Sequence, residues 1–158
     1  MKTPIIIALV LTGFSTSMAQ FGTANHDVTV QVATITVLQV SAGSVTLNIA
    51  SSSAVAGQDI MSVSDQSTSL LWGTNSSSQK ITINSSLVAP TFTLKALALN
   101  PTQGLSAAEA TLNSTPVDFL LNIGRSLGSC SIQYTGMALA SQGTGTDSHT
   151  ITFTIQTQ

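Results

Sequence analysis

The sequence predicts an all-β sandwich. Apolar and polar residues alternate with a period of two through most of the chain, as they do in strands with one buried face. The segments between these runs are rich in Gly, Ser and Asn, which favour turns. Ser and Thr together make up 46 of the 158 residues, and only 6% are charged, so neutral polar side chains occupy the outward positions.

The alternating runs give the predicted strands in order. The first changes phase near Ala33 and Thr34, where we expect a bulge or bend. The full set comprises residues 27–40, 45–49, 69–72, 80–84, 91–99, 117–123, 132–134 and 150–157. Strands that each have one apolar face predict two antiparallel sheets packed face to face. About seven or eight strands in a chain of this size fit an immunoglobulin-like sandwich.

One segment departs from the β pattern. Ser106 and Glu109 have the spacing of a capping box, and Ala110 and Leu112 follow them. We therefore expect one short helical turn that crosses between strands.

Residues 1–19 have the features of a cleaved secretory signal peptide. Lys2 supplies a positive start, and residues 5–14 form an apolar run of the usual length. Ser17 and Ala19 place small residues where signal peptidase would cut, before Gln20. A membrane helix needs about 20 apolar residues, so this run is too short for one. We expect an exported protein, in the periplasm, on the cell surface or in the medium.

The remaining residues, 20–158, are expected to form a single domain. They contain three basic and six acidic side chains, a net charge of about −3, which excludes a basic nucleic-acid binder. One cysteine excludes a disulfide-stapled miniprotein. An outer-membrane barrel of eight strands is a competing interpretation, but it favours strands of about 9 to 11 residues and aromatic girdles, and only six aromatic residues follow residue 19.

Candidate catalytic groups are few. The histidines lie in His26-Asp27 and Asp147-Ser148-His149, each just before a predicted strand, and no G-x-S-x-G motif supports a serine nucleophile. The six acids are scattered, with no spacing typical of a calcium loop or a catalytic pair. Cys130 reads as a small buried side chain, with an intermolecular disulfide as the alternative. We predict no enzymatic activity, no cofactor and no metal.

Two aromatic residues are candidates for a glycan platform. Exposed aromatic rings stack against sugars, and Trp72 and Tyr134 are the residues that could do so. The alternative is that they are core or half-buried side chains.

The two ends of the chain carry a second candidate. Edge strands normally carry charges that block edge-to-edge pairing, but residues 28–40 and 150–157 are uncharged. Such a strand can add to the sheet of a neighbouring molecule. The candidate donor or pairing positions are Val28, Val30, Val32, Ile35 and Val37. The alternative is that both ends pair within their own domain.

The segments HDVTVQVATITVLQV, SLLWGTNSSSQKITI and CSIQYTG, with the closing SHTITFTIQ, resemble a loose group of uncharacterised exported bacterial β-sandwich proteins. The closing strand is similar to those of fimbrial subunits, but the paired cysteines common in chaperone–usher subunits are missing. The resemblance implies an exported sandwich with no known activity, and it transfers no catalytic residue.

From these observations we expect a non-enzymatic structural or adhesive subunit at the cell surface. Its partners would be further copies of itself or another surface protein, with no transmembrane segment after signal cleavage. Assembly by strand exchange is the sharper form of this hypothesis. A carbohydrate-binding module is the alternative, and a hydrolase is the weakest candidate because little catalytic material is present.

Overall fold

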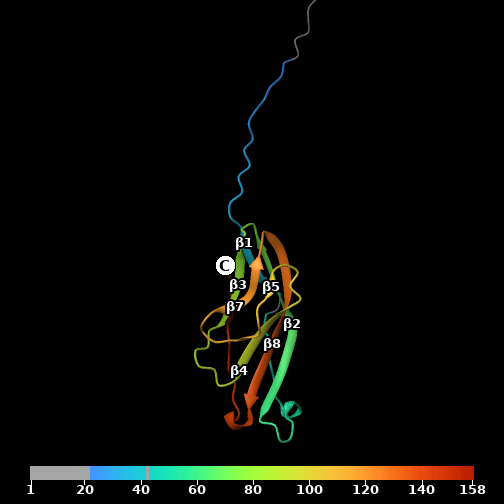
Figure 1. The fold of residues 1–158 in the computed structure, drawn as a ribbon, viewed down its shortest axis with the longest axis vertical. Coiled ribbons are helices and arrows are strands. Elements are labelled where there is room, and N and C mark those ends of the chain that lie inside the picture. Colours follow the sequence, from blue (N-terminus) through green and yellow to red (C-terminus); the bar gives the residue numbers. More distant parts are fainter. Residues whose placement is uncertain (1–21, 42) are drawn as a thin grey trace, which may run out of the picture. The chain divides into compact units, whose positions relative to one another are not determined.

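The computed structural model describes residues 22–41 and 43–158 (Figure 1). The chain divides into two units, residues 1–32 and residues 33–158. Every strand lies in the second unit. The predicted signal peptide, residues 1–19, and its cleavage site lie outside the described residues.

The second unit contains two antiparallel sheets, which confirms the predicted all-β sandwich architecture (Figure 1). The five-stranded sheet has the order β1 (Thr36–Val40), β2 (Ile60–Thr74), β8 (Ser126–Leu139), β4 (Thr93–Leu99) and β6 (Ala110–Thr111). The four-stranded sheet has the order β5 (Leu105–Ser106), β7 (Val117–Ile123), β3 (Gln79–Ser85) and β9 (Ile151–Thr157). β1 and β9 are edge strands of different sheets, and they lie on the same side of the sandwich, where they come close to each other.

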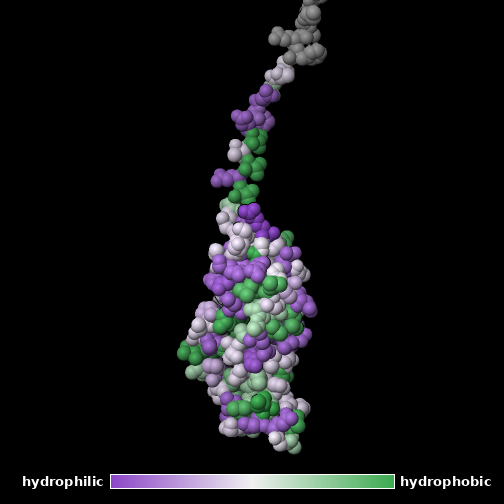
Figure 2. Space-filling model, in the orientation of Figure 1, coloured by the Kyte–Doolittle hydropathy of each residue, from purple (hydrophilic) through white to green (hydrophobic). Residues whose placement is uncertain are grey.

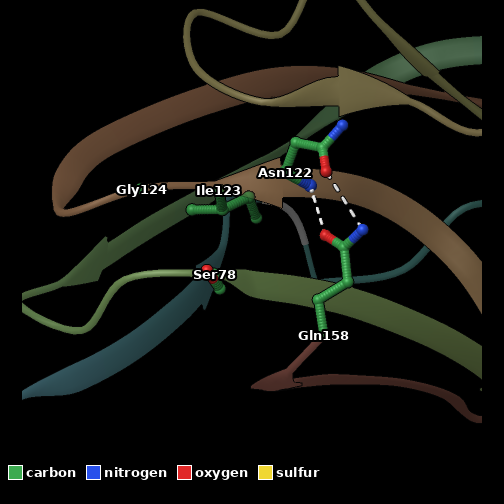
Figure 3. Close-up of a pocket in the computed structure, with 5 residues that line it drawn as sticks. All are labelled: Ser78, Asn122, Ile123, Gly124 and Gln158. Carbon is green, nitrogen blue, oxygen red and sulfur yellow. Dashed lines mark hydrogen bonds between the residues drawn. The ribbon is translucent and has the colours of Figure 1, made fainter.

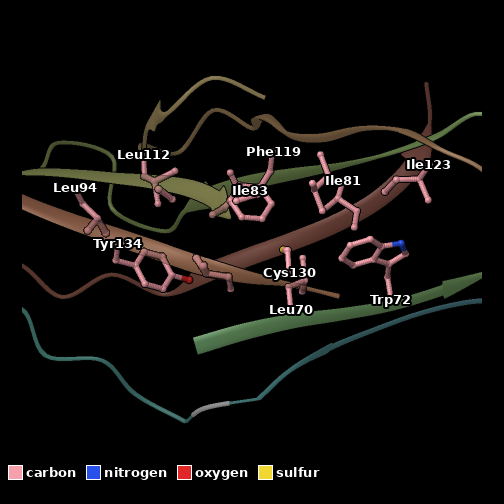
Figure 4. Packing of buried hydrophobic residues seen from close by; sticks show 14 residues of the cluster. Leu70, Trp72, Ile81, Ile83, Leu94, Leu112, Phe119, Ile123, Cys130 and Tyr134 are labelled. Carbon is pink, nitrogen blue, oxygen red and sulfur yellow. The ribbon is translucent and has the colours of Figure 1, made fainter. Parts of the chain in front are cut away.

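The core lies between the sheets and is built by the inward residues of the alternating runs (Figure 4). Phe119 and Phe153 meet edge to face, with ring centroids 5.3 Å apart. The largest fully buried side chains are Phe119, Leu70, Ile81, Ile83, Leu112, Leu120, Ile123 and Ile132. Burial of this apolar surface is the main favourable contribution to folding.

Trp72 requires a glycine opposite it. Gly128 pairs with Trp72 across β2 and β8, and a Cβ at Gly128 would overlap the indole ring. The absence of a side chain at position 128 therefore lets the indole lie flat against β8.

β2 is longer than the sequence pattern indicated. The prediction placed a short strand at 69–72, but the strand spans Ile60–Thr74 and pairs with β8 along most of its length. A register shift between Asp65 and Thr68 marks a bulge. There the Asp65 carboxylate accepts hydrogen bonds from the Ser67 hydroxyl (2.6 Å) and backbone N–H (3.0 Å), which lower its pKa.

The first predicted strand is shorter than expected. It begins at Thr36 rather than at residue 27. The predicted irregularity near Ala33 lies just before β1, where the Asn75 side chain, and not a strand, bonds to the backbone. Residues 45–49 keep the expected alternation of half-buried and exposed side chains, but they are not assigned to a strand.

The helical turn predicted around Ser106 and Glu109 is wrong. The Ser106 hydroxyl donates to the Ala98 carbonyl (2.7 Å), and Glu109 pairs with Lys95 (3.2 Å), so neither side chain caps a helix. This segment instead contains β5 and β6. Single 3₁₀ turns occur elsewhere, at Ser51–Ser53 and Ala140–Gln142.

Candidate assembly site

Residues 22–32, here called the arm, are all exposed and carry an alternating apolar row. Val28, Val30 and Val32 expose 74%, 83% and 70% of their surface, and Asp27, Thr29 and Gln31 occupy the alternate positions. Figure 2 shows apolar and polar residues following one another along the arm. If these three valines packed against another surface, the burial of each apolar side chain would contribute favourable free energy.

The junction between the arm and β1 is held by one side chain. The Asn75 amide donates to the Ala33 carbonyl (2.8 Å), and its Oδ1 accepts from the Ile35 N–H (2.8 Å). The Asn75 backbone N–H also donates to the Ile35 carbonyl (3.2 Å). Asn75 therefore extends the β1–β2 ladder by two residues.

Ile35 and Val37 differ from the three arm valines. The Ile35 backbone is bonded to Asn75, and Val37 pairs with Gly73 in β2. Their side chains are half exposed, but their backbone groups are engaged with β2. The candidate donor positions are thus reduced to Val28, Val30 and Val32.

β9 is the longest of the four edge strands in residues 22–41 and 43–158, and β1 comes near part of its open side without pairing with it. It pairs with β3 on one side only. Its inward side chains are Ile151, Phe153 and Ile155, and all three are only half-buried. The residues opposite them in β3 are fully buried: Ser85, Ile83 and Ile81. The edge therefore leaves an apolar row partly open to water.

The end of β9 is fixed by Gln158. Its backbone N–H donates to the Ser78 carbonyl (2.8 Å), and its side-chain amide exchanges two hydrogen bonds with Asn122 of β7 (Figure 3). Ser78, Asn122 and Gln158, together with Ile123 and Gly124, line an open pocket at this end of the sheet. The contacts hold β9 against β3 and leave its opposite edge unaffected.

Neither edge strand on this side of the sandwich carries a charge. β1 reads TVLQV and β9 reads ITFTIQT. The observed ion pairs lie on other strands: Lys80 of β3 with Asp118 of β7 (2.8 Å), and Lys95 with Glu109 (3.2 Å). Charged side chains that normally block edge pairing are thus absent from β1 and β9.

Residues 44–49 form a second segment whose backbone has no strand partner. Val45 and Leu47 pack against the core, and a Cβ at Gly136 would lie 3.3 Å from the Leu47 side chain. Within the described part of the chain, however, the backbone of residues 44–49 forms no hydrogen bond with another backbone group. Most backbone groups in folded proteins find a partner, so this segment has the character of an incomplete strand.

Trp72 and Tyr134 do not form a glycan platform. They expose only 3% and 7% of their surface and belong to the core cluster (Figure 4). Burial raises the pKa of the Tyr134 hydroxyl to about 12. The strand period places both side chains on the inner face, so neither ring can stack on a sugar.

His149 meets a serine, but no catalytic triad forms around it. Its Nδ1 lies 2.8 Å from Oγ of Ser85, which is fully buried and also accepts from the Leu87 N–H. The Asp147 carboxylate accepts from the Phe92 N–H (2.7 Å) rather than from His149. This arrangement ties the loop before β9 to the sandwich. His26 lies on the exposed arm.

Cys130 is a buried core residue of β8. Burial raises the pKa of its thiol to about 11. A protonated, buried thiol is a poor nucleophile and a poor disulfide partner.

Three further findings concern the chain as a whole. Among the described residues, His, Cys, Asp and Glu form no group of three or more that could hold a metal ion. The same residues contain no helix with the length and apolar character needed to cross a lipid bilayer. Comparisons with protein-family models, curated proteins and solved structures found no match.

Proposed function

We propose that this chain is an exported, non-enzymatic structural or adhesive subunit that assembles by donating its arm to another molecule. The observation that carries the proposal is the row formed by Val28, Val30 and Val32, each at least 70% exposed and alternating with polar residues. A row of this kind contributes little stability in a lone molecule, because its valines stay exposed. When it pairs with a sheet edge, it forms a strand with one buried face.

The fold proposed for the subunit is immunoglobulin-like. The order β1-β2-β8-β4 in one sheet and β3-β9 in the other corresponds to the order A-B-E-D and C-F of immunoglobulin constant domains. Export, through residues 1–19, would place the subunit in the periplasm, on the cell surface or in the medium. The resemblance of the closing strand to fimbrial subunits agrees with such a role.

The proposal is tested by altering the arm in the exported protein. The chain is expressed with its own N-terminal residues and isolated from the cell envelope or the medium, and its N-terminus is read by mass spectrometry. Size-exclusion chromatography with light scattering then compares the natural chain with a V28S/V30S/V32S variant. A T29S/Q31S variant is the matched control, because it changes the opposite side of the same segment.

We expect assemblies of the natural chain and of the control, and monomers of the triple variant with an unchanged melting temperature. Deletion of residues 20–33 should have the same effect as the triple variant. Equal assembly by all the chains would refute the proposal.

A further inference from the structure

Four strands lie at the edges of the two sheets. They differ in length and in the number of half-buried apolar side chains that an added strand could cover. β5 and β6 have two residues each, which is too short for a stable ladder. β1 has five residues and one half-buried inward side chain, Leu38. β9 has seven residues and three half-buried inward side chains. Of the four edge strands, β9 is the longest and has the largest number of half-buried apolar side chains.

The backbone of β9 has its free hydrogen-bonding groups at the same positions as these apolar side chains. Ser86 donates to the Thr150 carbonyl, and Gln158 donates to the Ser78 carbonyl. In an antiparallel pair the bonded residues alternate, so the even-numbered residues of β9 bond to β3. The N–H and C=O groups of Ile151, Phe153, Ile155 and Thr157 therefore point to the open edge.

The arm matches this edge in length, spacing and polarity. Residues 27–32 number six against the seven of β9, and residues 28–32 are uncharged. Val28, Val30 and Val32 have the two-residue spacing of Ile151, Phe153 and Ile155. In the immunoglobulin correspondence, the position beside β9 is that of the last strand, G.

We propose that the free edge of β9 is the acceptor for residues 27–32 of a second copy of this chain, an inference that rests on the proposed function. The arm backbone pairs with the odd-numbered residues of β9. Its valines cover the half-buried row of Ile151, Phe153 and Ile155, and Thr29 and Gln31 face water.

The donor belongs to another copy because of the junction at Asn75. Asn75 bonds to both Ala33 and Ile35, so residues 33–35 continue the β1–β2 ladder. Residues 33–35 therefore contain no turn that would let the chain reverse just before β1. Donation from copy to copy then repeats without limit, as in a head-to-tail assembly.

The test uses a proline in β9. Ile155→Pro removes an N–H that faces the open edge and leaves the bonds to β3 intact, because proline is tolerated on an edge strand when its missing N–H faces outward. Ile155→Ala is the matched control, since it removes the same side-chain packing but keeps the N–H. Both variants are made in the exported full chain and measured by light scattering and circular dichroism.

We expect Ile155→Ala, which shortens the apolar row but keeps the N–H, to assemble at a higher protein concentration, and Ile155→Pro to lose all species larger than a monomer. Mixing Ile155→Pro, whose arm is intact, with V28S/V30S/V32S, whose β9 is intact, should give 1:1 dimers and nothing larger. If Ile155→Pro assembles as Ile155→Ala does while the triple variant remains monomeric, the β9 assignment is overturned and the proposed function stands. If the triple variant assembles, the proposed function fails.

If Ile155→Pro does not fold, a second measurement tests whether β9 is the acceptor of the arm. In a Cys130→Ala background, a copy with Gln31→Cys is mixed with copies carrying a cysteine at Thr152, Thr154 or Gln156, the outward positions of β9. Disulfides need Cα atoms within about 7 Å, so only paired strands link. Dimers with at least one β9 position are expected, and none with Gln39→Cys on β1. Failure to link to any β9 position overturns the assignment.

Discussion

Replacing Val30 by Ala removes two methyl groups from the most exposed valine of the arm. Each buried methyl group contributes about 0.8 kcal/mol. Val30 exposes 83% of its surface in the single chain, so nearly all of that contribution would come from contact with a second copy. The expected loss is about 1.3 kcal/mol for each contact between copies, which corresponds to roughly tenfold in the association constant.

The assay is a dilution series followed by light scattering, with the concentration at half-assembly as the readout. The Val30→Ala chain should need roughly tenfold more protein to reach half-assembly. Thr29→Ala is the control, and it should move the midpoint much less because Thr29 would face water in the assembled sheet. The melting temperature of the monomer should be the same for both variants.

Two results would refute this reasoning. An unchanged midpoint for Val30→Ala would show that the valine row is not buried on assembly. A lower melting temperature of the monomer would show that Val30 packs within its own chain, and so is not available to a partner.

The remaining predictions concern the sandwich itself. Gly128→Ala should lower the free energy of unfolding by about 1 to 3 kcal/mol in a denaturant titration, because the new methyl group overlaps the Trp72 ring. The Cys130 thiol should resist a thiol reagent at pH 8 until the chain is unfolded. Because burial raises the pKa values of Cys130 to about 11 and of Tyr134 to about 12, the unfolded chain loses these protons first. Stability should therefore fall between pH 9 and 12, while these two groups contribute no change near neutral pH, as melting temperatures across that range would show. Asn75→Ala should speed hydrogen exchange at the Ile35 amide, because it removes the acceptor of that N–H.

Strands whose two faces differ strongly were predictable from the sequence. The run 117–123 was predicted with the bounds that β7 has. The first half of β2 was missed because Ser, Asp and Gln fill its positions and Asp65 and Ser67 form a bulge there. The first half of β2 is a strand because it pairs with β8, and the local sequence pattern does not reveal that pairing.

The error at Ser106 has a different origin. The residue spacing of a capping box was present, but the Ser106 hydroxyl and the Glu109 carboxylate each found a partner on β4. A motif of four residues does not show whether its side chains will instead form polar contacts with a distant strand.

The candidate site was predictable in part. Alternation alone identified Val28, Val30 and Val32, but it could not separate them from Ile35 and Val37, because the Asn75 contact joins residues about 40 positions apart. The burial of Trp72 was one of the two interpretations that the sequence left open, and the Gly128 contact in β8 that makes room for the ring is not visible in the local pattern. The free edge of β9 is a property of sheet order, which no local pattern encodes.

The claim that copies exchange strands is tested most directly by hydrogen exchange of the exported chain before and after assembly. Strand exchange predicts that the alternate amides of residues 27–32 that face β9, and those of Ile151, Phe153 and Ile155, exchange freely in the monomer and become protected together in the assembly. The even-numbered amides of β9 should be protected in both states, since they bond to β3. Assembly that leaves residues 27–32 as unprotected as in the monomer would contradict the account.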